Sequence, residues 1–370
     1  MKTDVVIIGA GIIGCSTAYF LAKKGLKVLL LEKNAAVGLE ASGRCACGIR
    51  QQGRTAALPL AMASVRLWST LADELACDLE YERIGNLRVA LNPERSECLE
   101  KELEWEHAQG LTEVRMLTSD ECRELIPGLT KQTISGKYCP TDGIANPMRV
   151  TPAFAQAAAR LGAEIRTKMQ VTGLLRQGSA ASGVATEAEE IEANVVLNTT
   201  GPWAMRINQM AECKTPIQPG LSQLIITERQ PKRIVPFTSF EKIGYILQTK
   251  TGNIIIGIEG KPNDSFSREV DFADMALKSK QIIEVLPWMG EVAFLRAFAG
   301  ITEYTPDGEP YIGEVPGVSG FYTASGFHGQ GFCVGPMVGT VMAELITGEE
   351  PSVSLAPFKI DRFAKVESPE

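Results

Sequence analysis

The chain has 370 residues, of which 45% are hydrophobic and 22% are charged, and this length predicts two lobes with separate cores. Its formal net charge of -7 argues against a surface for nucleic acid or anionic membrane, since both need basic residues to neutralise phosphate. No apolar run reaches the roughly 20 residues of a membrane helix, and residues 4–14 lack the basic leader and cleavage site of a signal peptide. We expect no membrane span and a cytoplasmic location.

The first predicted elements form a βαβ unit. Residues 5–8 are a continuous apolar run, which is typical of a parallel strand buried on both faces. Helical spacing follows over 12–24, and Gly25 separates it from a second apolar run at 27–31.

The next predicted elements are mostly helices. Apolar residues recur at helical spacing over 57–79, and the charged stretch 95–109 predicts a solvent-facing helix. Thr151 and Pro152 suit an N-cap and a first helical position, which predicts a helix over 151–161. The remaining segments are a buried strand at 194–198, antiparallel strands at 224–227, 245–248 and 253–258, and a helix at 338–346.

Cysteine and histidine usage limits the chemistry. The nine cysteines are scattered and include no C-x-x-C pair, which favours reduced thiols in a reducing compartment. Only His107 and His328 are histidines, so we predict no metal site, and a Ser-His-Asp hydrolase would have to use one of these two.

A glycine motif follows the first predicted strand and opens the first predicted helix. In Gly9-x-Gly11-x-x-Gly14, the glycines permit a tight turn, close approach of backbone to a pyrophosphate, and close helix-strand packing. Glu32 ends the second strand, where a carboxylate can accept hydrogen bonds from a ribose 2′-hydroxyl. We predict a dinucleotide site at Gly9, Gly11, Ile12, Ile13, Gly14, Glu32 and Lys33, and these residues leave NAD and FAD both open.

Five further segments carry a family resemblance over nearly the whole chain. They are SGRCACGIRQQ at 42–52, PTDGIANP at 140–147, NTTGPWA at 198–204, AGITEYTPDGEPYIG at 299–313 and SGFHGQGF at 325–332. With the glycine motif, they resemble the D-amino-acid oxidase superfamily of FAD-dependent amine oxidoreductases, and most of all the beta subunits of heteromeric proline dehydrogenase, sarcosine oxidase and opine oxidase.

The resemblance implies an α/β fold with two domains. One would be a Rossmann-like FAD-binding domain of the glutathione-reductase type, assembled from 1–82, 140–215 and 300–370. The other would be an α+β substrate-binding domain with a mixed antiparallel sheet, assembled from 83–139 and 216–299.

The same resemblance assigns cofactor contacts. The segment along the flavin would contribute Ser42, Gly43, Arg44, Cys45, Gly48 and Ile49. Val171 would lie at the adenine, and Thr200, Gly201 and Trp203 on the pyrophosphate side. The residues Gly326, Phe327, His328, Gly329, Gln330, Gly331 and Phe332 would approach the flavin ring, with a helix beginning just beyond them that points its positive end at the ring. A plain glycine-rich turn is the alternative reading of this last segment.

Two departures from the family pattern bear on the cofactor. Many relatives read GFSGHGF where this chain reads GFHGQGF, so the imidazole is displaced by two positions, and His328 would either face the flavin or cap a loop. Family members with covalent flavin carry a cysteine matching Gly300 or a histidine near Pro147, and neither is present here. The resemblance therefore implies non-covalent FAD.

Arg50, Tyr245 and His328 are the candidate catalytic residues. Arg50 could clamp a substrate carboxylate bidentately, and Tyr245 matches a family tyrosine at the start of a substrate-domain strand. The alternatives are an internal salt bridge for Arg50 and sheet packing for Tyr245. Relatives that oxidise glycine or sarcosine carry a basic residue at positions matching Thr302 or Cys333, which speaks against a simple amino acid as substrate.

The implied activity is oxidation of an amino acid or secondary amine of the proline, hydroxyproline, sarcosine or opine type. Hydride transfer to flavin N5 would give an imine that water hydrolyses. The chain would be the catalytic beta subunit beside a larger alpha subunit, and the resemblance leaves room for a small iron-sulfur subunit and for FMN at a subunit interface. The alternatives are a glycine-oxidase-like homo-oligomer and a non-catalytic flavin-binding electron-transfer subunit.

Overall fold

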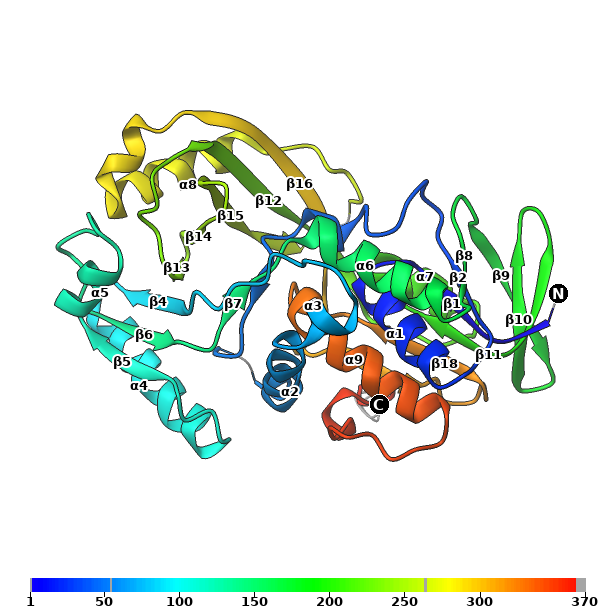
Figure 1. Cartoon of the computed structure of the whole chain (residues 1–370). Coiled ribbons are helices and arrows are strands. Elements are labelled where there is room, and N and C mark those ends of the chain that lie inside the picture. The colour runs from blue at the N-terminus through cyan, green and yellow to red at the C-terminus, as the bar shows by residue number, and fades with distance from the viewer. Residues whose placement is uncertain (1, 54, 263–264, 364–370) are drawn as a thin grey trace, which may run out of the picture.

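The computed structural model describes residues 2–53, 55–262 and 265–363, and the chain forms two lobes joined side by side (Figure 1). The end of the third predicted FAD-domain segment, 364–370, lies outside the described residues. The N-terminus and α1 to α3 mark one lobe, and the segments around α4, α5 and α8 mark the other (Figure 1).

The sheet of the first lobe is built around β1. Its strand order is β17 (Tyr311–Glu314), β18 (Phe321–Ser325), β11 (Glu190–Asn198), β1 (Lys2–Ile8), β2 (Val28–Leu31) and β8 (Glu164–Arg166). In addition, β10 (Ala180–Thr186) pairs with β11, and β9 (Val171–Gln177) pairs with β10. β1 pairs in parallel with β2 and with β11, and its residues Val5, Val6 and Ile7 are fully buried, as expected for a parallel strand covered on both faces. The predicted βαβ unit is present.

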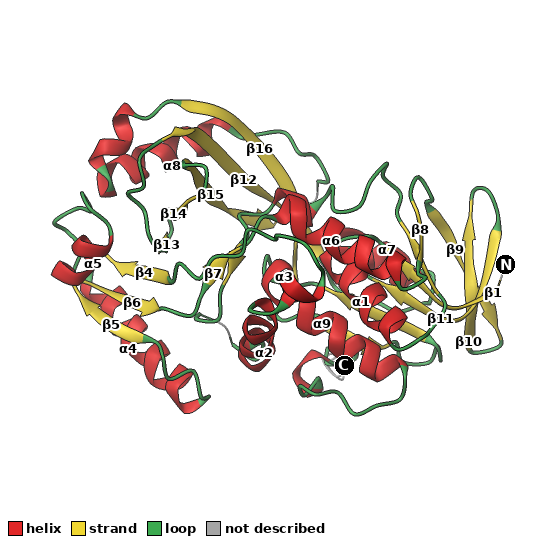
Figure 2. Cartoon of the chain, in the orientation of Figure 1, coloured by secondary structure: helices red, strands yellow, loops and turns green. Residues whose placement is uncertain are grey.

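Three helices pack on one another beside this sheet. They are α1 (Ile12–Lys23), α6 (Pro147–Arg160) and α9 (Gly331–Ile346) (Figures 1 and 2). A Cβ on Gly335 would lie 2.7 Å from Cγ1 of Ile12, and one on Gly339 would lie 2.6 Å from Oγ of Ser16. The glycines of α9 therefore let α1 approach closely, and Ser16 donates a hydrogen bond to the Gly335 carbonyl at 2.9 Å.

The second lobe holds a second eight-stranded sheet. Its order is β16 (Phe294–Tyr304), β12 (Gln218–Arg229), β15 (Asn253–Pro262), β14 (Gly244–Gln248), β13 (Phe237–Phe240), β4 (Asn86–Ala90), β6 (Ser135–Cys139) and β5 (Arg115–Thr118). All neighbouring pairs are antiparallel except β13 with β4. The predicted fold class, an α/β cofactor domain with an α+β partner of mixed sheet, is confirmed.

Helices also cover the second sheet and the junction between lobes. The second lobe contains α4 (Pro93–Ala108), α5 (Ser119–Leu125) and α8 (Phe272–Val285), and the junction and first lobe contain α2 (Leu58–Trp68), α3 (Leu71–Glu74) and α7 (Ala204–Gln209). The short 3-10 helices are η1 (Ala41–Arg44), η2 (Gly201–Trp203), η3 (Pro287–Glu291) and η4 (Ala356–Phe358). A two-stranded sheet of β3 (Gly48–Ile49) and β7 (Gly143–Ile144) lies where the chain passes between lobes.

Three predicted helix bounds were wrong. The helix predicted over 57–79 is divided into α2 and α3. α6 begins at Pro147, because Asn146 caps it by accepting a hydrogen bond from Met148 N at 3.0 Å, and Pro152 lies inside the helix. α9 begins at Gly331, seven residues before the predicted start, since its glycines and Pro336 have the composition of a loop.

Within the described residues, every helix is too short or too polar to cross a bilayer. All nine cysteines fall in this part of the chain, and each is a free thiol. The division into domains at the stated boundaries stays a proposal, and β16 runs continuously past position 300 to Tyr304.

Candidate active site

A cavity of about 790 Å³ lies between the two lobes. On one side it is lined by the ends of β1 and β2, by residues around η1, and by the segments that follow β11 and β18. On the other side it is lined by residues of β4, β13, β14 and β16. Both lobes therefore contribute residues to the site.

The glycine motif shapes the end of this cavity at the start of α1. A Cβ on Gly14 would lie 2.0 Å from the Gly9 carbonyl oxygen, so only glycine permits this packing of α1 on the turn. Gly9 has a φ of 98°, in the region that favours glycine. Ile12 N donates to Ser42 Oγ at 2.9 Å, so a short hydroxyl side chain lies at the helix N-terminus, where anions bind favourably.

Glu32 follows β2 directly and is 8% exposed. Its Oε2 accepts a hydrogen bond from Ala10 N at 2.9 Å, and its Oε1 accepts from the main-chain and side-chain nitrogens of Asn34, each at 2.8 Å. A carboxylate oxygen can accept two hydrogen bonds, so Oε2 can also accept one from a hydroxyl in the cavity. This arrangement suits a ribose.

Lys33 and Trp203 lie beside Glu32 at the cavity wall. The Lys33 ammonium is 3.3 Å from the centroid of the Trp203 ring, which itself stacks on Phe266 at 5.3 Å. Burial lowers the pKa of Lys33, and the nearby Arg206 acts in the same direction. An ammonium fixed over an aromatic ring at this wall favours an anionic ligand.

The segment around η1 is packed too closely to accept larger side chains. A Cβ on Gly43 would lie 2.3 Å from the Gly38 carbonyl oxygen, and a Cβ on Gly300 would lie 2.8 Å from Cβ of Arg44. A cysteine at position 300 would therefore displace Arg44, whose Nη1 donates to the Ala299 carbonyl at 3.1 Å.

Arg50, Phe237 and Tyr245 are stacked on the wall contributed by the second lobe. The Arg50 guanidinium carbon lies 4.8 Å from the centroid of the Phe237 ring, and Phe237 stacks on Tyr245 with centroids 5.2 Å apart and planes 25° apart. The Tyr245 ring also covers Gly257, where a Cβ would lie 1.8 Å from Cε2 of the ring. Tyr245 therefore packs on the sheet and lines the cavity at once, and Phe237 brings it next to Arg50.

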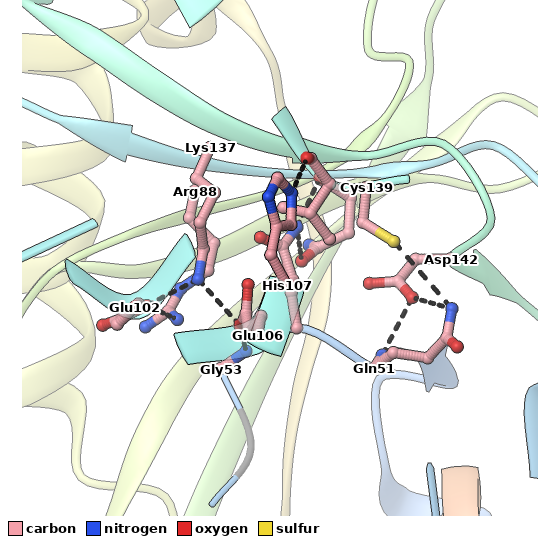
Figure 3. A network of polar contacts seen from close by, with 12 residues as sticks. Gln51, Gly53, Arg88, Glu102, Glu106, His107, Lys137, Cys139 and Asp142 are labelled. Atoms are coloured by element: carbon pink, nitrogen blue, oxygen red, sulfur yellow. Dashed lines mark hydrogen bonds and ion pairs between the residues drawn. The ribbon is translucent and has the colours of Figure 1, made fainter. Parts of the chain in front are cut away.

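Buried polar groups hold the chain that follows Arg50 (Figure 3). Gln51 N donates to Oδ1 of Asp142 at 2.8 Å, and the Gln51 side chain donates to Thr141 at 2.9 Å. Burial raises the pKa of Asp142 to about 6, although the hydrogen bonds from Gln51 act in the opposite direction. Gln52 Nε2 donates to Oδ1 of Asn86 at 2.7 Å, and Asn86 Nδ2 donates to the Phe237 carbonyl at 3.0 Å.

An ion network lies under the same segment (Figure 3). Gly53 N donates to Oε1 of Glu106 at 2.6 Å, and Lys137 contacts the carboxylates of Glu106 and Glu102 at 2.8 Å each. Arg88 also pairs with Glu102 and lines the cavity. Burial raises the pKa of Glu102, but Arg88 and Lys137 outweigh it and hold that pKa below its usual range. The network positions a cation, Arg88, at the cavity.

The segment 326–332 joins β18 to α9. Gly326 has a φ of 81° and lies against Thr305, and Gln330 is the N-cap of α9. The ring of His328 lines the cavity and meets the ring of Tyr304 edge-on, with centroids 4.5 Å apart. α9 thus begins inside the predicted flavin-contacting segment, and its first turn is close to the cavity.

Most of the predicted site residues line this one cavity. From the cofactor set these are Gly9, Gly11, Ile12, Ile13, Glu32, Lys33, Ser42, Arg44, Cys45, Gly48, Val171, Thr200, Gly201, Trp203, Phe327, His328, Gly329, Gln330, Gly331 and Phe332, and from the catalytic set Arg50, Tyr245 and His328. Gly14, Gly43, Ile49 and Gly326 are not among the lining residues. The first two permit tight packing behind the wall, and Ile49 is fully buried.

Sequence reasoning missed many residues that line the cavity, and among them are Arg88, Phe237, Glu303 and Tyr304. Arg88 lies between apolar residues in β4, and Glu303 is an acidic residue near the end of the mainly apolar β16. A charged side chain in such a run is a signal that could have found them. Phe237 carries no comparable signal, because an aromatic residue at the start of a strand is ordinary.

The comparison with protein families decides the class of cofactor. Residues 4–345 match the family model described as "DAO: FAD dependent oxidoreductase". The chain belongs to this family. The prediction of an FAD-dependent oxidoreductase is confirmed, and FAD rather than NAD is the dinucleotide of the family.

Several family relatives extend over almost the whole chain. A glycine oxidase of Geobacillus kaustophilus is 28% identical, covering 98% of this chain and 97% of its own length. A hydrogen cyanide synthase subunit HcnC of Pseudomonas aeruginosa is 27% identical, covering 97% of this chain and 96% of its own length. The crystal structure of an L-proline dehydrogenase from P. horikoshii superposes with a TM-score of 0.94 at 31% identity, covering 100% of this chain and 99% of that one.

The residues present fit FAD. The turn at Gly9 and Gly14 leaves no room for a Cβ, the N-terminus of α1 faces the cavity, and Glu32 offers a carboxylate oxygen to it. These groups would hold the dinucleotide, and the segments 42–48 and 327–332 would lie along it.

Proposed function

We propose that the chain oxidises an amino acid or secondary amine of the proline, hydroxyproline, sarcosine or opine type. The observation that carries this proposal is the stack of Arg50, Phe237 and Tyr245 on the cavity wall that faces the glycine-rich segments. The names of the relatives support it, since glycine oxidase and L-proline dehydrogenase both act on amino acids.

In this proposal Arg50 binds the substrate carboxylate. Its guanidinium presents paired N–H donors that match the two carboxylate oxygens, and the Phe237 ring limits its rotation. The hydrogen bonds of Gln51 and Gln52 fix the adjoining backbone, so the guanidinium is held before substrate arrives.

The remaining wall orients the amine and keeps water away. Bound FAD supplies a hydride acceptor, so that an amine becomes an imine. The rings of Phe237, Tyr245 and Tyr304 give this part of the cavity an apolar surface, which favours the neutral form of an amine. We include His328 among the substrate-site residues because its ring lines the cavity against Tyr304.

Replacement of Arg50 tests this function. Anaerobic mixing of the holoenzyme with proline, hydroxyproline, sarcosine, glycine and opines should bleach the flavin with at least one of them. Arg50→Ala should raise the apparent dissociation constant for that substrate by about 10- to 150-fold, the equivalent of a charge-assisted hydrogen bond of ~1.5–3 kcal/mol. Arg149→Ala, which replaces an exposed arginine outside the cavity, should leave the apparent dissociation constant unchanged. Unchanged affinity in Arg50→Ala would contradict the clamp.

We further propose that the chain is the catalytic beta subunit of a heteromeric dehydrogenase or oxidase, with a larger alpha subunit and a small iron-sulfur subunit. The similarity to a protein named as a subunit, HcnC, supports this. Affinity purification from the native source should recover both partners, and acid extraction should release FMN besides FAD if a second flavin lies at a subunit interface.

The similarity to glycine oxidase favours a second candidate, a self-sufficient homo-oligomeric oxidase. The isolated chain would then produce hydrogen peroxide from glycine or sarcosine at a rate that partner subunits do not change. Flavin bleaching by any amine in the isolated chain would contradict a purely structural electron-transfer role.

A further inference from the structure

Glu303 is a buried carboxylic acid of the cavity with no role in the proposed amine oxidation. It is the next-to-last residue of β16 and lies opposite Pro219 of β12 in the second sheet. Its side chain lines the cavity although the residue is only 7% exposed. A carboxylic acid in such a place is costly unless its oxygens have partners.

The two carboxyl oxygens have different surroundings. Oε1 accepts a hydrogen bond from Phe327 N at 2.9 Å, which ties β16 to the segment before α9. Oε2 is buried and makes no hydrogen bond with any of the described residues. A Cβ on Gly201 would lie 2.8 Å from Oε2, so this oxygen is directed at the glycine-rich segment that follows β11.

We propose that Glu303 belongs to the cofactor site and that, in its protonated form, it donates a hydrogen bond through Oε2 to an oxygen of bound FAD. Both segments that it contacts, at Gly201 and at Phe327, also line the cavity whose glycine turn and Glu32 fit FAD. A bound oxygen would give Oε2 the partner that the protein itself does not supply.

Burial favours the protonated form of Glu303. Burial raises the pKa of Glu303 to about 7, against the effect of the backbone N–H groups of Phe327 and Gly326. The titratable side chains that line the cavity from the elements packed around it are Arg44 of η1, His328 of the 326–332 segment and Tyr304 of its own strand. Lys261 of β15 is exposed and pairs with Asp274. The residues of η2, and those of β12 opposite it from Gln218 to Gly220, carry no charge.

The pyrophosphate of FAD adds negative charge to the same cavity. An ionised Glu303 would be repelled by it, whereas a protonated one can donate. Binding of FAD should therefore raise the pKa of Glu303 further, so that the protein takes up a proton when it binds the cofactor. Affinity for FAD should then be greatest below pH 7 and should fall as the pH rises above 7.

Proton uptake by the full-length chain gives a direct measurement. Addition of FAD to apoprotein in weakly buffered solution should remove most of one proton per FAD at pH 8, where a group with a pKa of about 7 is mostly ionised, and much less at pH 5.5. Glu303→Gln, which keeps an acceptor for Phe327 N and carries a neutral donor, should abolish the uptake at pH 8. Equal uptake by the two proteins would overturn the proposal.

Equilibrium dialysis of the holoenzymes gives the second measurement. The dissociation constant for FAD should rise by up to about tenfold per pH unit above pH 7 in the wild type and should change little in Glu303→Gln. The dissociation constants of the wild type and Glu303→Gln should agree near pH 6, and this agreement also shows that the variant folds. Glu284→Gln, at an exposed glutamate of α8, should behave as the wild type. Parallel pH profiles for the wild type and Glu303→Gln would contradict the role of Glu303.

The inference rests on FAD binding and not on the substrate. A chain that shows this proton uptake but oxidises none of the amines would contradict the proposed function alone. A chain that oxidises an amine with no difference between wild type and Glu303→Gln in uptake or affinity would contradict the inference alone.

Discussion

The two walls of the cavity are built by different physical means. The wall from the first lobe consists largely of backbone, brought close by glycines at which a Cβ would collide with a carbonyl oxygen or a neighbouring helix. The wall from the second lobe consists of side chains, which buried ion pairs and amide hydrogen bonds hold in place. Steric exclusion thus shapes the first-lobe wall, which is the proposed cofactor side, and electrostatics shapes the second-lobe wall, which is the proposed substrate side.

Of the two walls, the one that the ion network holds should lose more stability when a residue is replaced. Lys137 is fully buried and Glu106 is 1% exposed, so Lys137→Met would leave a carboxylate buried without its cation. We expect a loss of about 3–5 kcal/mol in the free energy of unfolding, measured by urea denaturation. The double variant Lys137→Met, Glu106→Gln should recover most of the lost free energy of unfolding, because glutamine carries no charge and its side-chain oxygen still accepts a hydrogen bond from Gly53 N. Lys101→Met, on the exposed face of α4, is the control.

Asp142 should make the substrate side sensitive to pH. Burial raises its pKa from the ordinary value of 3.8 to about 6, so its contribution to stability is fully present below pH ~4 and is lost as the pH rises through 6. The shift corresponds to roughly 3 kcal/mol. The unfolding free energy of the wild type should therefore fall relative to that of Asp142→Asn as the pH rises from 4 to 7. An unchanging difference, as expected for exposed Asp73→Asn, would show that burial of Asp142 has no such effect.

The cofactor side should respond to added volume instead of lost charge. Gly14→Ala would place a methyl group 2.0 Å from the Gly9 carbonyl oxygen, and overpacking of this kind costs about 1–3 kcal/mol. We expect a lower unfolding free energy and weaker FAD binding, with no added dependence on pH. Gly290→Ala, where the nearest atom is 3.5 Å away, should be nearly neutral. Equal effects of Gly14→Ala and Gly290→Ala would contradict the steric explanation.

The smallest effect is expected where an aromatic ring supports Arg50. Phe237→Leu keeps an apolar side chain but removes the ring under the guanidinium, an interaction worth about 0.5–1 kcal/mol. The KM for the substrate identified by flavin bleaching should rise by roughly two- to fivefold. A decrease in kcat at constant KM would show that Phe237 acts on the chemistry and not on the clamp.

The difference between the two walls also explains which site residues could be predicted from the sequence. Close backbone approach needs glycines at fixed spacing, so Gly9, Gly11 and Gly14 indicate their function in a single short segment. The substrate wall joins residues far apart in sequence, such as Arg88 and Phe237, which only sheet pairing between β4 and β13 brings together. Local composition also misled the prediction of α9, because its glycines serve contact with α1 and not a turn.

The segment from Ser42 to Gly53 passes from the N-terminus of α1, through β3, to the ion network of the second lobe. One stretch of backbone thus carries groups that we assign to the cofactor and groups that we assign to the substrate. A transplant of the second sheet with α4 into a relative would separate this stretch from Asn86 and Glu106, which hold it. Exchange of specificity between family members would therefore need the loop and its anchors to be moved as one unit.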